Sequence, residues 1–192
     1  SDVCSSDLTQ AMEVLATELP GVLMIKPRLF ADERGHFFEG YNQRDLAAQA
    51  GIDLPFVQDN QSRSKKGVLR GLHYQNPQAQ GKLVRVLAGE IFDVVVDIRR
   101  SSSSFGKVAT VRLAAQDAAT LWVPAGFAHG FLVLSEFADV LYKTTDFYAP
   151  QSEHCILWND PALAIAWPLS TEPQLSPKDR VGKLLKDAPV YA

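Results

Sequence analysis

The feature that most restricts the fold is a series of short apolar segments that recur about every ten residues. Each segment is rich in Val, Leu, Ile, Phe and Thr, and residues such as Gly, Pro, Asn, Asp and Ser separate one segment from the next. The segments occupy residues 82–88, 90–98, 107–113, 119–124, 129–134, 138–145 and 153–158. Short strands at this spacing are typical of an antiparallel sandwich or barrel, so the sequence predicts an all-β fold.

The segment "EIFDVVVDI" at 90–98 also predicts where a polar cavity lies. Successive side chains of a strand point to opposite faces of the sheet. One face therefore carries Phe92, Val94, Val96 and Ile98, and the other carries Ile91, Asp93, Val95 and Asp97. Two carboxylates on one face of a central strand indicate a polar cavity on that side, because a charge is costly to bury unless it is paired.

Helical patterns are confined to two short segments. Residues 42–51 predict one helix that ends at Gly51. Residues 176–188 predict a second helix, with Ser176 as its N-cap and Pro177 at the first helical position.

The domain organisation follows from length and from the pattern near the N-terminus. A chain of 192 residues is long enough for one domain and short for two, so we expect a single domain over 12–192. Residues 1–11 show neither periodicity nor a capping pattern. We expect them to be a non-native extension ahead of a natural start at Met12.

Composition argues against several classes of function. The net charge is −3, and no basic run is longer than Lys65-Lys66, which argues against general nucleic-acid binding. No apolar run approaches the roughly 20 residues that span a membrane. No secretory apolar region is recognisable, so we expect a cytoplasmic protein that binds neither nucleic acid nor membranes.

The segment "WVPAGFAHGF" at 122–131 places His129 in a Pro-x-Gly-x-x-His turn that enters a strand. This pattern resembles the second motif of the cupin family of double-stranded β-helix (jelly-roll) barrels, in which that His binds a metal. The first-motif region reads "GLHYQ", with Gln75 where a second His would stand. A transition-metal site needs three or four suitable donors, and this spacing does not supply them. We expect a cupin-like barrel with a few short peripheral helices, no metal and no other cofactor.

A polar barrel interior with His73, Lys82 and Tyr142 suits proton-transfer chemistry. A His accepts a proton near neutral pH, and a Lys stabilises an enolate oxygen in a water-poor site. A Tyr hydroxyl can donate a proton from the opposite side. Each residue alone also fits a structural role, but the combination predicts an epimerase that removes a proton beside a ketone and returns one to the other face.

Seven strings in order carry a more specific resemblance. They are "FADERGHFFEGYN", "FVQDNQSRSKKGVLRGLHYQ", "QGKLVRVLAGEIFDVVVDIR", "LWVPAGFAHGF", "LYKTTDFYAP", "ILWNDPALAIAWP" and "LSPKD". With these strings the chain resembles the dTDP-4-dehydrorhamnose 3,5-epimerase family from Met12 to its C-terminus. The resemblance implies a cofactor-independent enzyme that forms homodimers.

The same resemblance implies a role for each matching residue. His73 would take the sugar protons, and Asp179 would orient its imidazole. Tyr142 would be the acid on the opposite face, and Lys82 would stabilise the enolate. His129 would lie in the same cavity, where we expect it to pair with Asp93.

The remaining matches would line the nucleotide-sugar site. Arg34 and Arg70 suit a pyrophosphate, because a guanidinium group can bind phosphate oxygens through two hydrogen bonds. Tyr148 would stack on thymine, although this chain has Phe147-Tyr148 where many relatives carry two tyrosines. The full predicted set is Arg34, Glu39, Gln58, Asp59, Asn60, Arg70, Lys82, His129, Tyr148, Glu153 and Lys178.

The implied reaction is inversion at C3 and C5 of dTDP-4-dehydro-6-deoxy-D-glucose, which yields dTDP-4-dehydro-L-rhamnose. One alternative is an epimerase that inverts a single carbon of another dTDP-4-keto-deoxysugar. A second is a non-catalytic cupin that binds nucleotide sugars, and a third is a metal-dependent cupin oxygenase. The sequence alone does not decide whether one or both carbons are inverted.

Overall fold

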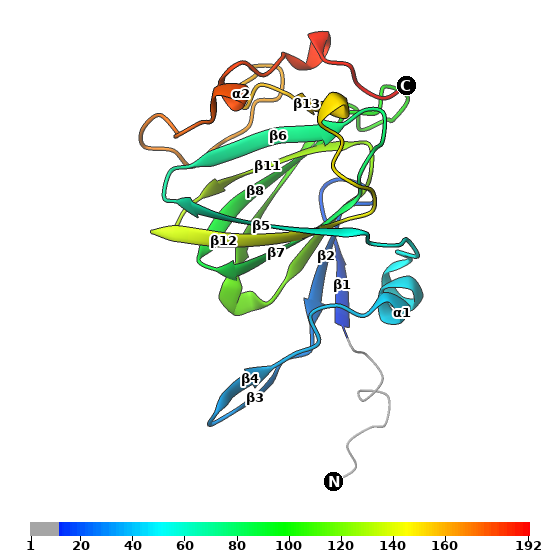
Figure 1. The fold of residues 1–192 in the computed structure, drawn as a ribbon, viewed down its shortest axis with the longest axis vertical. Helices are drawn as coiled ribbons and strands as arrows, with labels where there is room; N and C mark the ends of the chain where they lie inside the picture. The colour runs from blue at the N-terminus through cyan, green and yellow to red at the C-terminus, as the bar shows by residue number, and fades with distance from the viewer. Residues whose placement is uncertain (1–11) are drawn as a thin grey trace.

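The computed structural model describes residues 12–192. The prediction that residues 1–11 are a non-native extension lies outside the described residues. The chain forms two antiparallel sheets that face each other, together with a small protruding hairpin (Figure 1). This arrangement confirms the predicted all-β, cupin-type jelly roll with short peripheral helices.

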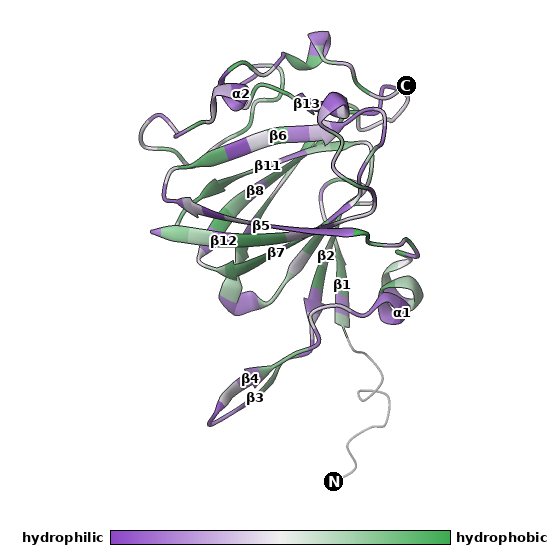
Figure 2. Cartoon of the chain, viewed as in Figure 1, coloured by the Kyte–Doolittle hydropathy of each residue, from purple (hydrophilic) through white to green (hydrophobic). Residues whose placement is uncertain are grey.

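The first sheet has six strands. In spatial order they are β1 (Met12–Ala16), β2 (Leu23–Pro27), β10 (Thr120–Val123), β7 (Lys82–Ala88), β12 (Phe137–Thr144) and β5 (Gln58–Lys65). Figure 2 shows that β5, at the edge, is hydrophilic along its length, whereas β7 and β12 are mainly hydrophobic. A polar edge strand is consistent with a strand that has one face toward solvent and the other toward a polar cavity.

The second sheet has five strands. In spatial order they are β13 (Glu153–Cys155), β6 (Leu69–Gln75), β11 (Phe127–Val133), β8 (Glu90–Asp97) and β9 (Val108–Ala114). His129 of β11 lies directly opposite His73 of β6 in the strand register. Cross-strand neighbours of this kind have side chains on the same face of the sheet, so both imidazoles point toward the space between the sheets.

Apolar side chains fill most of the space between the two sheets. Val84 and Val140 of the first sheet pack in one cluster with Val95 and Phe131 of the second. The opposite face of the second sheet, which carries Val94, is covered by the segment after β13. Burying each such side chain stabilises the fold by about 1.5–3 kcal/mol.

The predicted alternation along β8 is confirmed, but its two carboxylates have different hydrogen-bond partners. Asp93 is fully buried on the face that looks toward the first sheet. Asp97 instead accepts hydrogen bonds from Arg99, Ser102 and Ser104 in the turn that follows. These donors hold the pKa of Asp97 below its ordinary value although burial opposes ionisation. Asp93 therefore lies behind the cavity wall, bonded to His129, and Asp97 has no part in the site.

The first predicted helix is confirmed. α1 (Gln43–Asp45) continues as a π-helical turn over Leu46–Ala50 and ends at Gly51, as expected. Gly51 has a φ of +68°, a left-handed conformation that glycine adopts at little cost.

The second predicted helix, 176–188, is wrong in extent. α2 spans only Pro177–Arg180, although Ser176 caps it as predicted. The chain leaves the helix because Lys183 forms a parallel bridge with Ile156, and Gly182 packs against that backbone. No helix within residues 12–192 is long and apolar enough to cross a membrane.

The hairpin formed by β3 (Phe30–Asp32) and β4 (Gly35–Phe37) projects away from both sheets (Figure 1). Phe30 and Phe37 are 53% and 70% exposed. Phe30 and Phe37 are direct cross-strand partners, so their rings lie on the same face of the hairpin and form one exposed apolar patch.

Candidate active site

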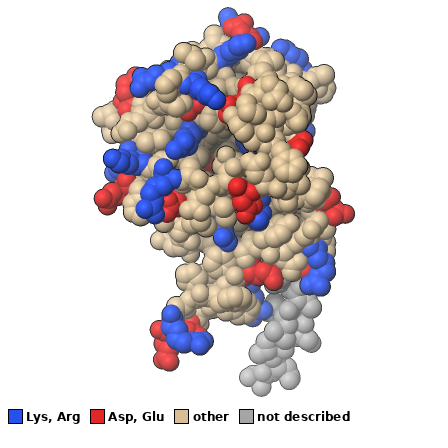
Figure 3. Space-filling view, viewed as in Figure 1, with Lys and Arg blue, Asp and Glu red and all other residues tan. Residues whose placement is uncertain are grey.

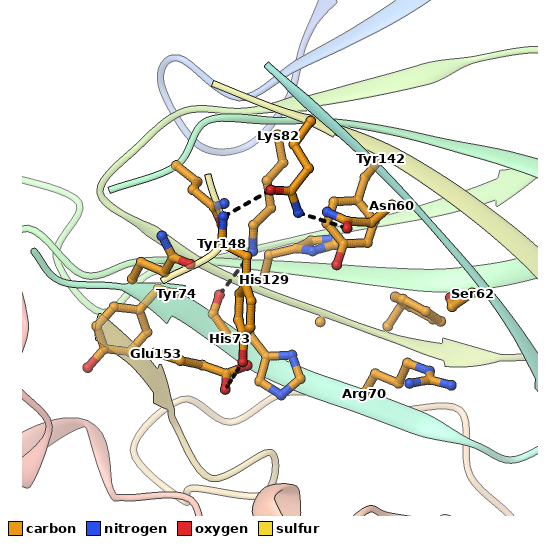
Figure 4. A pocket seen from close by; sticks show the side chains of 15 residues that line it. Asn60, Ser62, Arg70, His73, Tyr74, Lys82, His129, Tyr142, Tyr148 and Glu153 are labelled. Carbon is orange, nitrogen blue, oxygen red and sulfur yellow. Dashed lines mark hydrogen bonds between the residues drawn. The ribbon is translucent and has the colours of Figure 1, made fainter. Parts of the chain in front are cut away.

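A polar cavity of about 370 Å³ opens between the two sheets. Strands β5, β7 and β12 supply one wall, and β6, β11 and β13 supply the other. Nine residues of the predicted site line it, namely Gln58, Asn60, Arg70, His73, Lys82, His129, Tyr142, Tyr148 and Glu153 (Figure 4). Residues that are far apart in the sequence thus meet in one place.

His73 and Asp179 form a hydrogen-bonded pair. Nε2 of His73 lies 2.5 Å from Oδ1 of Asp179, which is almost fully buried. Asp179 is held by the N-terminus of α2, where its backbone N–H donates to Ser176. Burial opposes ionisation of Asp179, but the hydrogen bond with His73 keeps its pKa below the ordinary value. A carboxylate fixed in this way sets the orientation of the imidazole and leaves Nδ1 as the ring nitrogen that can accept a proton.

Tyr142 reaches the cavity from the opposite sheet. It lies on β12, in register with Asn60 on β5 and with Val84 on β7. Burial is the main reason that its pKa lies above the ordinary value, so the hydroxyl carries its proton at neutral pH. Figure 4 shows Tyr142 and His73 on different strands, with their side chains directed into the same cavity.

Lys82 places an amine at the floor of the cavity. It shares a face of β7 with Val84, is 9% exposed, and its Nζ lies 3.5 Å from the backbone oxygen of His73. Burial lowers the pKa of Lys82 to about 8, although Asp93 and Glu153 act in the opposite direction. The amine is therefore charged at neutral pH and loses its charge in mildly alkaline solution.

The expected pairing of His129 with Asp93 is confirmed. Nε2 of His129 lies 2.8 Å from Oδ2 of Asp93, and both side chains are buried. Burial raises the pKa of Asp93, while His129 and Lys82 counteract the rise. Oδ1 of Asp93 has no hydrogen-bond partner among residues 12–192. The pair forms a second His–Asp unit beside the first.

The outer part of the cavity carries the residues predicted to bind the nucleotide. Arg70 is oriented by Ser64, whose hydroxyl accepts from Nε at 2.9 Å. The Tyr148 hydroxyl donates to Glu153 at 3.0 Å, and the Lys178 ammonium group lies 2.9 Å from the same carboxylate oxygen. Lys178 thus reaches the rim through Glu153 and does not line the cavity itself.

Besides Lys178 and Asp179, which bond to cavity residues, three predicted residues lie outside the cavity within this chain. Asp59 sits between Gln58 and Asn60, so strand alternation turns it to the other face of β5, where it pairs with Lys143 at 2.9 Å. Arg34 lies in the protruding hairpin and forms an ion pair with Asp32.

Glu39 lies just beyond that hairpin, and its carboxylate accepts a hydrogen bond from Asn42 at 2.9 Å. The fold of one chain therefore brings neither Arg34 nor Glu39 to the cavity.

Other residues line the cavity that the sequence did not identify as site residues. Ser62 follows Gln58 and Asn60 at intervals of two, so the period of β5 could have revealed it. No sequence pattern marked the others, which are Tyr74, Gln75, Gln80, Gly130 and Phe131.

Among residues 12–192, one group of side chains has donors close enough for a metal ion. Ligand atoms of His73, Cys155 and Asp179 lie within 4.8 Å of one another. His73 and Asp179 are already joined by a short hydrogen bond, and burial raises the pKa of the Cys155 thiol to about 12. The arrangement is therefore explained as a His–Asp pair with a neutral thiol beside it.

Comparison with known proteins agrees with this geometry. The family model described as dTDP-4-dehydrorhamnose 3,5-epimerase matches residues 16–187. A dTDP-4-dehydrorhamnose 3,5-epimerase from Pseudomonas aeruginosa is 57% identical over 180 residues, which cover 94% of this chain and 99% of that protein.

Solved structures show the same fold. A dTDP-6-deoxy-D-glucose-3,5-epimerase from Legionella pneumophila, in complex with dTDP-4-keto-L-rhamnose, superposes with a TM-score of 0.89 at 52% identity. The match covers 91% of this chain and 93% of that one. A 3'-monoepimerase from Streptomyces bikiniensis, in complex with dTDP-quinovose, superposes with a TM-score of 0.83 at 35% identity and covers 91% and 88% of the two chains. This chain belongs to the dTDP-4-dehydrorhamnose 3,5-epimerase family.

Proposed function

We propose that the protein inverts C3 and C5 of dTDP-4-dehydro-6-deoxy-D-glucose and produces dTDP-4-dehydro-L-rhamnose. The observation that carries this proposal is the placement of the His73–Asp179 pair and Tyr142 on opposite walls of one cavity. A base and an acid that face each other can remove a proton from one side of a carbon and supply one to the other.

His73 acts first. Its imidazole takes the proton from a carbon next to the C4 ketone, and the electron pair of that bond moves onto the ketone oxygen as an enolate. Lys82 stabilises the negative oxygen by its charge. The enolate then collapses and takes the Tyr142 proton on the opposite face, which inverts the carbon. Solvent removes the proton from His73 and returns one to Tyr142, so the cycle balances and can repeat at the second carbon.

The outer residues are proposed to hold the nucleotide. Arg70 is pre-oriented by Ser64 and suits the pyrophosphate. The ring of Tyr148 offers a face on which thymine can stack, a contact worth about 1–3 kcal/mol. On the face drawn in Figure 3, Lys and Arg side chains are interspersed with Asp and Glu. This mixture suits a small charged ligand better than a long polyanion.

We also propose that a second copy of the chain completes the site. Arg34 and Glu39 match the nucleotide-sugar site by resemblance, yet the fold holds them on or beside the protruding hairpin. The exposed rings of Phe30 and Phe37 would be buried if the hairpin packed against a partner. A homodimer that exchanges this region would carry the two residues toward the partner's cavity.

Loss of the Lys82 charge is expected to reduce activity in alkaline solution. The pKa of Lys82 is about 8, so the ammonium form needed for the enolate is lost as the pH rises through that value. We expect kcat/KM to fall roughly tenfold per pH unit above about pH 8, since kcat/KM reports ionisations of the free enzyme.

The dependence of kcat/KM on pH is measured for wild type, Lys82→Arg and Lys82→Met. Lys82→Arg is expected to remove the alkaline fall, because a guanidinium stays charged. Lys82→Met is expected to lower kcat/KM at all pH values. Lys143→Met, on the outer face of β12, is the control and should keep the wild-type profile. A wild-type profile that stays flat through pH 8, or the same fall in Lys82→Met, would contradict this role.

The proposed reaction is tested by incubating the protein with dTDP-4-keto-6-deoxyglucose in heavy water and following the sugar by NMR. Deuterium at C3 and C5 of an inverted product supports the proposal. Deuterium at one carbon supports the single-carbon epimerase, since the Streptomyces bikiniensis relative is a 3'-monoepimerase. Binding without exchange supports the non-catalytic cupin. Activity that a chelator removes and iron restores supports the oxygenase.

A further inference from the structure

Gln75 is a buried amide at the end of β6, two residues after His73. The residue is only 4% exposed. Its Nε2 donates to the backbone carbonyls of Gln78 at 2.8 Å and Phe147 at 3.2 Å. Its Oε1 accepts from the backbone N–H of Ala149 at 2.9 Å. Both N–H donors and the acceptor oxygen of the amide are therefore used inside the protein.

Two of these hydrogen bonds clamp the residues on either side of Tyr148. The carbonyl of Phe147 and the N–H of Ala149 are fixed by the same side chain, and the N–H of Tyr148 donates to Gln58 at 3.0 Å. Tyr148 itself is 47% exposed, so packing contributes little to its direction. The direction of its ring is set mainly by this backbone and by the hydroxyl bond to Glu153.

Strand β6 also fixes the position of Glu153. Residues Gln75 and Glu153 are direct cross-strand partners in the pairing of β6 with β13. The end of β6 thus holds the loop that carries Tyr148 and also the carboxylate to which its hydroxyl donates. His73 lies on this strand too, so one rigid element fixes both the base and the stacking ring.

We propose that Gln75 is a positioning residue for the nucleotide. It holds Tyr148 in the direction needed to stack on the base and keeps that contact in register with His73. This inference rests on the proposed function. The buried position at which a metal cupin would carry a second histidine serves here to brace the substrate loop.

The test replaces Gln75 with Met, which has a similar shape but makes no hydrogen bond. The Kd for dTDP is measured by calorimetry, and kcat and KM are measured with the full substrate. We expect Kd and KM to rise about tenfold and kcat to change less than about threefold, because binding contacts shared by substrate and transition state are lost. Gln75→Glu, which keeps the acceptor but loses both donors, is expected to show the same pattern.

The matched control is Asn76→Leu. This variant also removes two side-chain hydrogen bonds to backbone carbonyls, those of Pro189 and Val190, but leaves the Tyr148 loop intact. Asn76→Leu is expected to lower the melting temperature about as much as Gln75→Met does. It is expected to leave the Kd for dTDP within about twofold of wild type.

A double-mutant cycle with Tyr148→Ala separates positioning from general stability. If Gln75 acts through Tyr148, then Gln75→Met should raise Kd by less than about twofold in the Tyr148→Ala background. The same tenfold loss in both backgrounds, or an unchanged Kd in Gln75→Met, overturns the inference. If wild type itself binds no dTDP, both the proposed function and this inference are wrong. If wild type binds dTDP tightly and Gln75→Met binds it with the same Kd, only this inference is wrong.

Discussion

The variant His73→Ala is expected to lose at least ~10²–10⁴-fold in kcat for inversion at both carbons, which is the usual contribution of a positioned general base. The loss should affect C3 and C5 alike, because one imidazole in the cavity serves both. Asp179→Asn should lose activity as well, since the amide carries no negative charge and its NH2 group can donate to Nε2, which selects the other imidazole tautomer. The measurement is the rate of product formation by NMR at saturating substrate.

The control for His73 is His154→Ala. His154 lies on the neighbouring strand β13, and its ring is 2.9 Å from the backbone oxygen of Asn76, outside the cavity. It should keep kcat near wild type. Because His73→Ala leaves the buried Asp179 without its partner, the melting temperature is expected to fall, and kcat is compared at a temperature at which the variant is folded. If His73→Ala stays within about threefold of wild-type kcat, His73 is not the base.

The variant Tyr142→Phe is expected to lose about 10²-fold or more in net inversion, because the enolate has no proton donor on its second face. The substitution removes only the hydroxyl, so the cavity keeps its shape and the Kd for dTDP should stay near wild type. Tyr41→Phe removes a hydroxyl outside this cavity and serves as the control. Wild-type inversion by Tyr142→Phe would exclude this hydroxyl as the acid.

Much of the inner site was predictable because strand alternation and sequence motifs report on the same faces. The motif around His129 and the alternation of β8 predict that His129 and Asp93 meet on one side of the sheet, and the structure pairs them at 2.8 Å. Alternation also separates Gln58 and Asn60 from Asp59, which lies on the outer face. Resemblance alone implies that all three line the site, whereas the two-residue period of β5 places Asp59 on the opposite face.

The parts that were missed depend on tertiary contacts. The helix predicted over 176–188 stops at Arg180 because a bridge between Lys183 and Ile156 takes the chain elsewhere. A local pattern of helix-forming residues carries no information about such a bridge. The sequence marks Gln75 only by the absence of a histidine, because the loop that its side chain holds is distant in the sequence.

The proposed mechanism requires a base and an acid on opposite faces of the same sugar, and one measurement separates their roles. Tyr142→Phe is incubated with the substrate in heavy water, and deuterium uptake is compared with inversion at C3 and C5. We predict that uptake continues with the original configuration, because His73 still removes a proton and returns a deuteron to the same face. The His73→Ala variant should show neither uptake nor inversion. Uptake in His73→Ala, or its complete loss in Tyr142→Phe, would contradict the assignment of the base and the acid.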